Sequence, residues 1–244
     1  MELSLDGAAR VSRRPVVVGV VVGYAVLLVL AAGVRTGFPP QLRLDEALSR
    51  ALYAGDDRSA ALNALLQVLT TPGYTWFRLL VFCPVVVWLA LRRAWWTAAW
   101  VLTAIVLVGP LTTLAKVVVG RLRPQFAGGG AQLQSLSFPS GHASGVATLV
   151  TVGLLLAWPV LGVTARRIGL VAGAALVAVV GLSRMWLGVH FLSDVLGGWA
   201  FGVAWSLTVA LVVGALPGGR AALPPGAPAA RVGPVGGTGP DARP

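Results

Sequence analysis

Residues 16–34 read VVVGVVVGYAVLLVLAAGV, a stretch without a single charged side chain. A helix needs about 20 consecutive apolar residues to cross the hydrocarbon layer of a bilayer, so this stretch predicts a membrane-spanning helix. Arg13 and Arg14 precede it, as they would in a secretory signal peptide. The apolar run is long for a signal peptide, however, and lacks a convincing cleavage site of small residues. We therefore expect it to remain as an anchor.

Five further apolar blocks follow, at residues 74–91, 94–115, 143–163, 168–189 and 195–216. The whole chain is 57% hydrophobic and only 11% charged, whereas about a quarter of the residues of a soluble protein are charged. We expect an all-α fold, a polytopic membrane bundle of about six transmembrane helices over residues 16–216. A cytoplasmic N-terminus at residues 1–15 would precede it.

Two segments differ from the spans in composition. Residues 217–244 are mainly Pro, Gly and Ala, too poor in apolar surface to fold, and we predict a disordered tail. Residues 42–69 mix leucines with charged side chains, which favours a helical pair in the outer membrane interface. We interpret this pair as a plain connector, with a lid or access ramp as the alternative.

The formal net charge of +11 does not indicate nucleic acid, because the arginines are scattered between apolar blocks without a basic stripe interleaved with aromatics. Their clusters in short segments instead predict orientation, since such clusters stay in the cytoplasm. The clusters are Arg10, Arg13 and Arg14; Arg92 and Arg93; and Arg166 and Arg167. We therefore expect a protein of the cell membrane. Its extracytoplasmic face would carry residues 35–73, residues 116–142 and the turn near His190.

Several other residues are expected to lie outside any functional site. Five isolated arginines are expected to be solvated or to face lipid headgroups: Arg35, Arg43, Arg50, Arg58 and Arg78. Tryptophans near the span ends suit an interfacial aromatic belt: Trp76, Trp95, Trp96 and Trp186. The single Cys83 excludes an intrachain disulfide and is expected to be a small buried hydrophobe.

The scarce polar residues of the apolar region gather on one side. Lys116 is the only lysine, His142 and His190 are the only histidines, and Asp194 is the only carboxylate in residues 58–240. All four fall at the predicted outer ends of spans. Polar groups at membrane depth are costly and are usually functional, so we expect a site at the outer face.

The first polar cluster is Lys116 followed by Arg123 and Pro124. The seven-residue separation is close to two helical turns, so the two cations could face one way. Gly120 and Pro124 indicate that the helix ends in this region, which would free Arg123 to curl over a site.

The second cluster is Phe138-Pro139-Ser140-Gly141-His142, directly before the fourth span. Ser140 is a good N-cap. The free backbone N–H groups at such a helix start form an anion site.

The third cluster is Ser183-Arg184-x5-His190-x3-Asp194. If both residues are helical, the i, i+4 relation lets Asp194 reach the imidazole of His190. A carboxylate on one ring nitrogen leaves the other free to attack. With the cations and the helix start, these residues make a phosphoryl-transfer site, and His142 is left as the general acid.

At these positions the chain resembles the type 2 phosphatidic acid phosphatase (PAP2) superfamily, which also includes the vanadium haloperoxidases. The family pattern is Lys-x6-Arg-Pro, Pro-Ser-Gly-His and Ser-Arg-x5-His-x3-Asp, and all three parts are present in order. The motifs cover residues 116–194, and the six-span layout extends the resemblance to residues 16–216.

The resemblance implies roles for eight residues and implies no metal or other cofactor. His190 would be the nucleophile that forms a phosphohistidine, Asp194 would orient it, and His142 would protonate the departing alcohol. The phosphate oxygens would be held by Lys116, Arg123, Ser140, the backbone N–H of Gly141, and Arg184. Arg121 falls outside the pattern, and we expect an outer-loop cation there.

We therefore expect an integral membrane phosphatase that hydrolyses a lipid phosphate or lipid pyrophosphate monoester, with the bilayer and the lipid as its partners. The alternatives are a dedicated undecaprenyl pyrophosphate phosphatase, a non-enzymatic transporter of anionic lipid, and a haloperoxidase-like oxidase. Phosphatidic acid, phosphatidylglycerol phosphate and diacylglycerol pyrophosphate all present a terminal phosphate to such a pocket, so the head group and the oligomeric state stay open.

Overall fold

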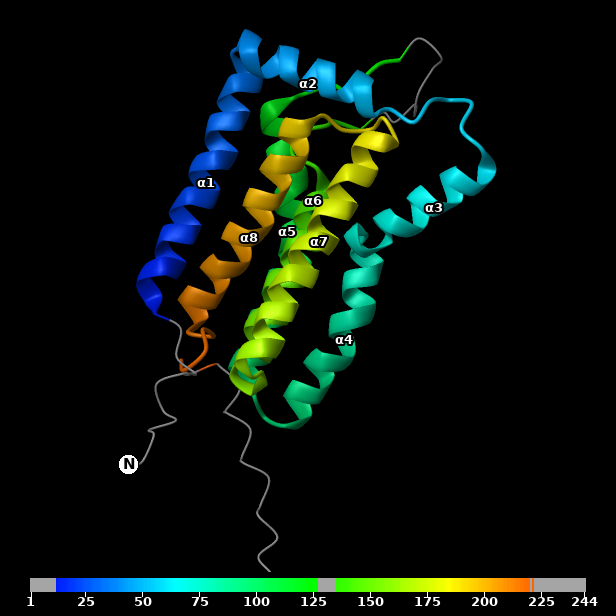
Figure 1. Cartoon of the computed structure of the whole chain (residues 1–244). Helices are drawn as coiled ribbons and strands as arrows, with labels where there is room; N and C mark the ends of the chain where they lie inside the picture. The colour runs from blue at the N-terminus through cyan, green and yellow to red at the C-terminus, as the bar shows by residue number, and fades with distance from the viewer. Residues whose placement is uncertain (1–11, 127–134, 220, 222–244) are drawn as a thin grey trace, which may run out of the picture.

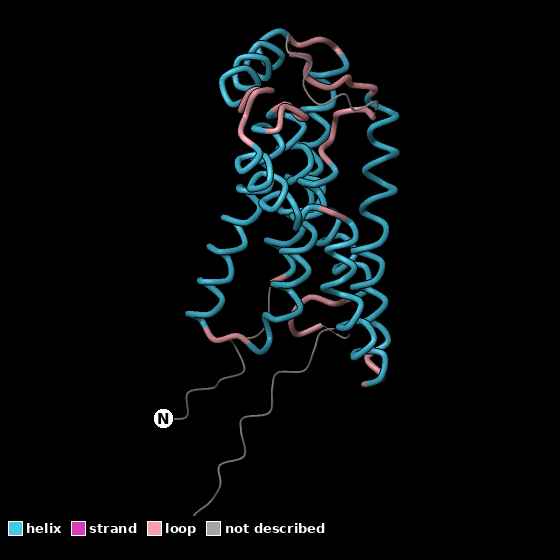
Figure 2. The backbone as a smooth tube through the Cα atoms, turned by 90° about the vertical axis from the view of Figure 1, so that its right-hand side faces the viewer, coloured by secondary structure: helices cyan, strands magenta, loops and turns pink. Residues whose placement is uncertain are grey.

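The computed structural model describes residues 12–126, 135–219 and 221, and these residues form helices and loops without a strand (Figure 2). Figure 1 shows the helices as a bundle of long rods with one end covered by a shorter helix. In chain order the elements are α1 (Arg13–Arg35), α2 (Pro39–Leu52), α3 (Ala60–Thr70), η2 (Thr71–Gly73), α4 (Thr75–Leu91), α5 (Trp95–Val119), α6 (Gly141–Ala157), η3 (Trp158–Val160), α7 (Val163–Trp186) and α8 (Leu192–Val213).

The predicted membrane bundle is confirmed, with one span broken. The helices α1, α5, α7 and α8, and α6 continued by η3, are long and apolar enough to cross a membrane. The remaining span is a bent pair: α3 with η2 meets α4 at 45°. Because α4 alone has only 17 residues, it counts as a sixth span only together with α3 and η2. The protein is a multi-pass membrane protein.

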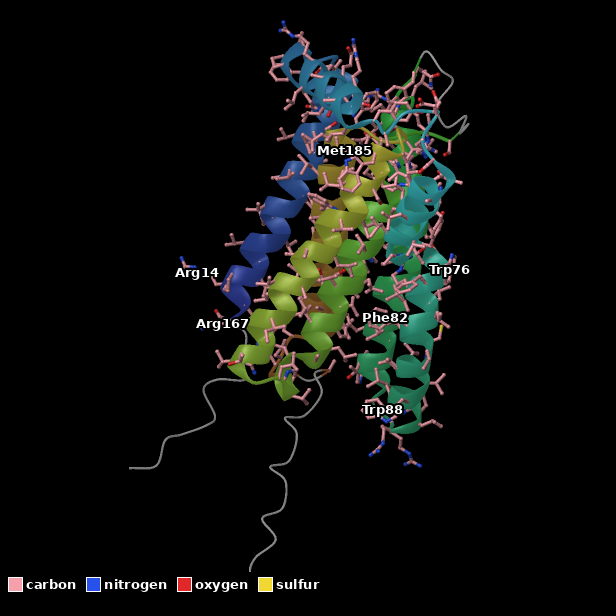
Figure 3. The ribbon with its side chains drawn as sticks, turned by 45° about the vertical axis from the view of Figure 1, so that its right-hand side comes forward. Arg14, Trp76, Phe82, Trp88, Arg167 and Met185 are labelled. Atoms are coloured by element: carbon pink, nitrogen blue, oxygen red, sulfur yellow. The ribbon has the colours of Figure 1, made fainter. Side chains whose placement is uncertain are left out.

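The two ends of the bundle differ in what they carry. In Figure 3, Arg14 and Arg167 lie at the end where α1 begins and α7 starts, whereas Met185 lies near the opposite end. The described parts of the connection from α5 to α6, and the connection from α7 to α8, lie at this opposite end, near α2 (Figure 1). The predicted site residues come from these connections and the adjoining helix ends.

Close packing of α6 against α8 fixes the geometry there. A Cβ atom built on Gly202 would lie 2.4 Å from the carbonyl oxygen of Ser144, and one built on Gly198 would lie 2.6 Å from that of Ser140. Small residues allow such backbone contact between membrane helices. The start of α6 is also bonded to α8, because the Ser140 N–H donates to the Asp194 carbonyl oxygen at 2.9 Å.

The prediction for residues 42–69 is partly wrong. Two helices form, α2 and α3, but α2 is no plain connector, because it buries Asp45 and Ser49 at the end of the bundle that carries the predicted site residues. The predicted tail lies mostly outside the described residues. Its first part packs on the bundle, where Thr97 Oγ1 donates to the Ala221 carbonyl oxygen at 2.5 Å.

The predictions for Cys83 and Arg78 are also wrong. Cys83 is exposed on the surface of α4 and is not buried within the protein. Any apolar contacts that it makes there would be with lipid. Arg78, in the same helix, is only 1% exposed and lies among α4, α5 and α6. By contrast Trp76 and Trp95 are exposed as a belt requires, and Trp76 points away from the bundle in Figure 3.

Candidate active site

His190 and Asp194 meet as predicted, but by a different local geometry. His190 lies before α8 and is not helical, and Asp194 is the third residue of that helix. The Asp194 carboxylate accepts the N–H of the N-cap residue Phe191 at 2.9 Å and lies 3.3 Å from His190 Nδ1. The helix cap, and not an i, i+4 pair within one helix, therefore presents the carboxylate to the imidazole.

The His190 ring is buried, with 2% of the residue exposed. Burial lowers the pKa of His190 to about 3, although the hydrogen bond to Asp194 acts in the opposite direction. The ring is therefore neutral at pH 7. With Nδ1 on the carboxylate, Nε2 is the nitrogen left for chemistry.

Gly188 makes the turn before His190 possible. Its φ of +70° lies in the left-handed region, and an added Cβ would lie 2.6 Å from the Tyr53 ring. The glycine thus lets the chain reverse after α7 while Tyr53 packs over it.

Ser137 is a site residue that the sequence analysis missed. Its hydroxyl donates to Asp194 Oδ2, the same carboxylate oxygen that His190 Nδ1 contacts. The hydroxyl oxygen also lies 3.4 Å from His190 Nδ1. It precedes the second motif by one residue, and no local pattern distinguishes it from other loop serines.

Arg121 lies in the loop after α5, as expected, but its side chain is buried and is not a solvated cation. Its side chain is 8% exposed and bridges two carboxylates, at 2.8 Å from Asp194 Oδ1 and 2.7 Å from Asp45 Oδ2. Asp45 also accepts both the N–H and the hydroxyl of Ser193, at 2.9 and 2.5 Å. The sequence signal for this contact is charge. An arginine side chain that is buried beside Asp194 in an apolar chain needs further partners, and α2 supplies Asp45.

Arg123 reaches the site as predicted, but not on the same helical face as Lys116. The helix α5 ends at Val119, and Gly120 caps it with a φ of +72°. From the following loop, Arg123 Nη1 donates to the Val189 carbonyl oxygen at 2.6 Å and lies 3.2 Å from His190 Nε2. Burial lowers the pKa of Arg123, but a guanidinium still stays charged at pH 7.

Lys116 secures the loop that leads into the second motif. Its ammonium donates to the carbonyl oxygens of Leu136 and Ser137, at 2.5 and 3.0 Å. This places the only lysine of the chain directly beside the segment that contacts Asp194.

The N-cap prediction for Ser140 is confirmed. Its side chain accepts the N–H of Ala143 at 3.5 Å, and α6 begins at Gly141. His142 lies in the first turn with its ring edge against Tyr74, at 4.4 Å between centroids. His142 Nε2 is buried and has no hydrogen-bond partner among the described residues.

Arg184 is a second group with an unsatisfied buried nitrogen. One terminal nitrogen donates to Thr70 Oγ1 at 3.1 Å, whereas Nε has no partner among the described residues. Buried polar atoms almost always have a partner. Arg184 and His142 therefore mark where a polar ligand would be accommodated.

A cavity of about 420 Å³ opens between α4 and α5 and reaches His142 at the start of α6. Its lining includes Tyr74, Arg78, Lys116, Gly141 and His142. The cavity therefore leaves space beside the unsatisfied His142 side chain.

The Asp45 contact can be tested by substitution. Asp45→Asn leaves the buried Arg121 with one carboxylate partner, and we expect the unfolding free energy to fall by about 3 kcal/mol. In the control, Glu46→Gln removes an exposed ion pair with Arg50, which should change it by less than about 0.5 kcal/mol. Thermal unfolding in detergent measures both. Equal unfolding temperatures would contradict the buried bridge.

Comparisons with known proteins agree on one family. The family model described as the PAP2 superfamily matches residues 97–216. The chain is 32% identical to phosphatidylglycerophosphatase B of Bacillus subtilis over 179 residues, which cover 72% of this chain and 85% of the relative. Decaprenylphosphoryl-5-phosphoribose phosphatase of Mycobacterium tuberculosis is 37% identical over 132 residues, 53% of this chain and 64% of the relative. Lipid A 1-phosphatase of Rhizobium etli is 33% identical over 126 residues, 48% and 50%.

The fold agrees with these matches. The crystal structure of a transmembrane PAP2 type phosphatidylglycerolphosphate phosphatase from Bacillus subtilis superimposes with a TM-score of 0.65 and 27% identity, over 79% of this chain and 94% of the other. The relatives are named phosphatases, and 85% of the Bacillus subtilis phosphatidylglycerophosphatase B is matched. The chain therefore belongs to the PAP2 superfamily and is a multi-pass membrane phosphatase that hydrolyses phosphoric monoesters of lipids.

Proposed function

We propose that the protein removes the terminal phosphate from a lipid phosphate or lipid pyrophosphate through a phosphohistidine on His190, without a metal ion. The observation that carries this proposal is the orientation of the His190 ring. Its Nδ1 lies 3.3 Å from the Asp194 carboxylate, and its Nε2 lies 3.2 Å from the Arg123 guanidinium. A neutral, oriented imidazole nitrogen beside a cation is arranged to attack a phosphorus atom.

In the first step, His190 Nε2 forms a bond to phosphorus while the bond from phosphorus to the lipid oxygen breaks. His142, as the imidazolium, gives the proton on its Nε2 to the departing oxygen, which leaves as the alcohol or as the lipid monophosphate, and His142 becomes a neutral imidazole. In the second step, water attacks the phosphohistidine and His142 takes up a proton from that water. Inorganic phosphate leaves and both histidines return to their starting states.

The phosphate would be held by fixed positive groups. Arg123 and Arg184 supply guanidinium nitrogens, Lys116 an ammonium, Ser140 a hydroxyl, and the start of α6 the backbone N–H of Gly141. A phosphate oxygen would also satisfy the buried Arg184 Nε. Such preorganised charge stabilises the transition state of phosphoryl transfer.

The relatives narrow the substrate class only to lipid phosphates. Their names refer to phosphatidylglycerophosphate, lipid A and a decaprenylphosphoryl sugar phosphate. These lipids differ in both tail and head group, and the terminal phosphate is what they share. We accordingly propose a phosphomonoesterase for membrane lipids, whose pocket between α4 and α5 admits the lipid from the bilayer.

The roles of the two histidines can be separated by leaving group. His190→Ala removes the nucleophile, so turnover should fall to background with both a lipid phosphate and p-nitrophenyl phosphate. His142→Ala should be severely impaired on the lipid but partly active on p-nitrophenyl phosphate, whose leaving group needs no proton. Phosphate release in detergent measures both. Substantial turnover by His190→Ala would show that the nucleophile is misassigned.

Metal independence follows from the cationic pocket. Within the described ranges, no three His, Cys, Asp or Glu side chains gather as a metal site would require. EDTA should therefore leave the phosphatase rate largely intact, and orthovanadate should inhibit because it adopts five-coordinate geometry. An enzyme that EDTA inactivates and magnesium restores would disprove this part of the mechanism.

We further propose that the active site faces away from the cytoplasm. Support comes from the arginines at the opposite end, including Arg14 and Arg167 (Figure 3), because basic residues stay inside. In a Cys83→Ser background, Thr36→Cys should react with an impermeant thiol reagent on intact cells, and Ala165→Cys should not. Both positions are exposed and lie at opposite ends. The reverse labelling pattern would invert the orientation.

A further inference from the structure

Arg78 is a buried cation that the proposed mechanism does not use. It lies in α4 and is only 1% exposed, among the largest fully buried side chains of the described residues. A charged side chain inside a membrane bundle costs a few kcal/mol unless it is paired or hydrated. The burial of this charge therefore needs a specific structural or functional explanation.

The protein satisfies only part of the guanidinium. Arg78 Nε donates to the Ile105 carbonyl oxygen at 2.9 Å, and Nη2 has a long contact of 3.5 Å with Thr75 Oγ1. No ion pair formed by the described residues includes Arg78. Its charge is therefore not neutralised by a carboxylate, in contrast to the charge of Arg121.

Arg78 lines the same cavity of about 420 Å³ as Lys116 and His142. A contact with α6 gives the position of the Arg78 guanidinium along the bundle. A Cβ built on Gly145 would lie 2.7 Å from Arg78 Nη1. Gly145 is three residues after His142, which corresponds to about 4.5 Å along a helix. The guanidinium thus lies about one helical turn deeper in the bundle than the residue assigned to the leaving oxygen.

The contact with Ile105 does not account for the charge of Arg78. Pro110 interrupts the hydrogen bonding of α5, and the N–H that it lacks would have bonded the Val106 carbonyl oxygen, four residues back. Arg78 Nε donates instead to the neighbouring Ile105 carbonyl oxygen. A neutral donor could make that bond as well, so the contact leaves a positive charge that faces a cavity unexplained.

We propose that Arg78 forms a second anion subsite, which binds a phosphoryl group that stays on the lipid when the terminal phosphate leaves. The inference rests on the proposed function, because His142 defines the leaving-group side. A guanidinium recognises phosphate oxygens in bidentate geometry. The substrate class is then a lipid whose leaving group carries its own phosphate, joined directly as a pyrophosphate or through a short linker as a phosphodiester.

The test compares three lipids with identical dioleoyl chains: phosphatidic acid, diacylglycerol pyrophosphate and phosphatidylglycerol phosphate. Only the last two carry a second phosphate. In the full chain in mixed micelles, Arg78→Gln should lower kcat/KM for these two by roughly 10- to 100-fold, the range for a lost charge-assisted hydrogen bond. For phosphatidic acid the change should stay within about twofold, and Arg78→Lys should restore part of the loss.

Arg35→Gln is the matched control, because it removes the same charge from an exposed residue that bonds the Val118 carbonyl oxygen outside the cavity. It should affect all three lipids equally. A loss confined to the pyrophosphate would support the subsite and identify the directly bonded phosphate as its ligand. A loss confined to phosphatidylglycerol phosphate would support it and identify the phosphodiester.

Equal losses on all three lipids, or no loss on any, would overturn the subsite and leave Arg78 a structural residue. A measurement on the unmodified enzyme guards against a misfolded variant: methylenediphosphonate should inhibit hydrolysis of phosphatidic acid more tightly than inorganic phosphate does, and the reverse order would also overturn it. The proposed function fails separately, if His190→Ala hydrolyses these lipids as fast as the unmodified enzyme.

Discussion

The Asp194 carboxylate is the contact point on which the active-site end of the bundle depends. It accepts from the Phe191 N–H, from Ser137 and from Arg121, and it lies against His190 Nδ1. A buried carboxylate with fewer partners would carry a large desolvation cost. The need to satisfy one charge thus joins the start of α8, the loops before α6 and α8, and the end of α5. Through Arg121 it also recruits Asp45 of α2.

The bundle below turns this local network into a fixed site. Gly198 and Gly202 let α8 approach the backbone of α6, so that the Ser140 N–H reaches the Asp194 carbonyl oxygen. The same approach sets the start of α6, and with it His142, relative to His190. Catalysis by preorganised charge needs groups that do not reorganise during the reaction. Close packing of α6 against α8 provides that rigidity.

The sequence predicted what depends on neighbouring residues. Apolar block length predicted the spans, and Gly120 and Ser140 predicted the end of α5 and the start of α6, because a cap is a local feature. It did not predict the bridge from Asp45 to Arg121 and Asp194, since these residues are far apart in the chain and meet only after the helices pack. Arg78 was misjudged for the same reason: its burial depends on α5 and α6, which its own helix does not reveal.

Phosphorylation of His190 during turnover is the step on which the mechanism depends. To detect it, the His142→Ala variant is mixed with p-nitrophenyl phosphate labelled on its phosphate, quenched without acid, and the label is mapped by mass spectrometry. This leaving group needs no proton, so the intermediate should still form, and its slow hydrolysis without His142 should favour its accumulation. We predict an acid-labile phosphate on His190, absent from the double variant that also carries His190→Ala. Label on another residue, or label retained without His190, would contradict the mechanism.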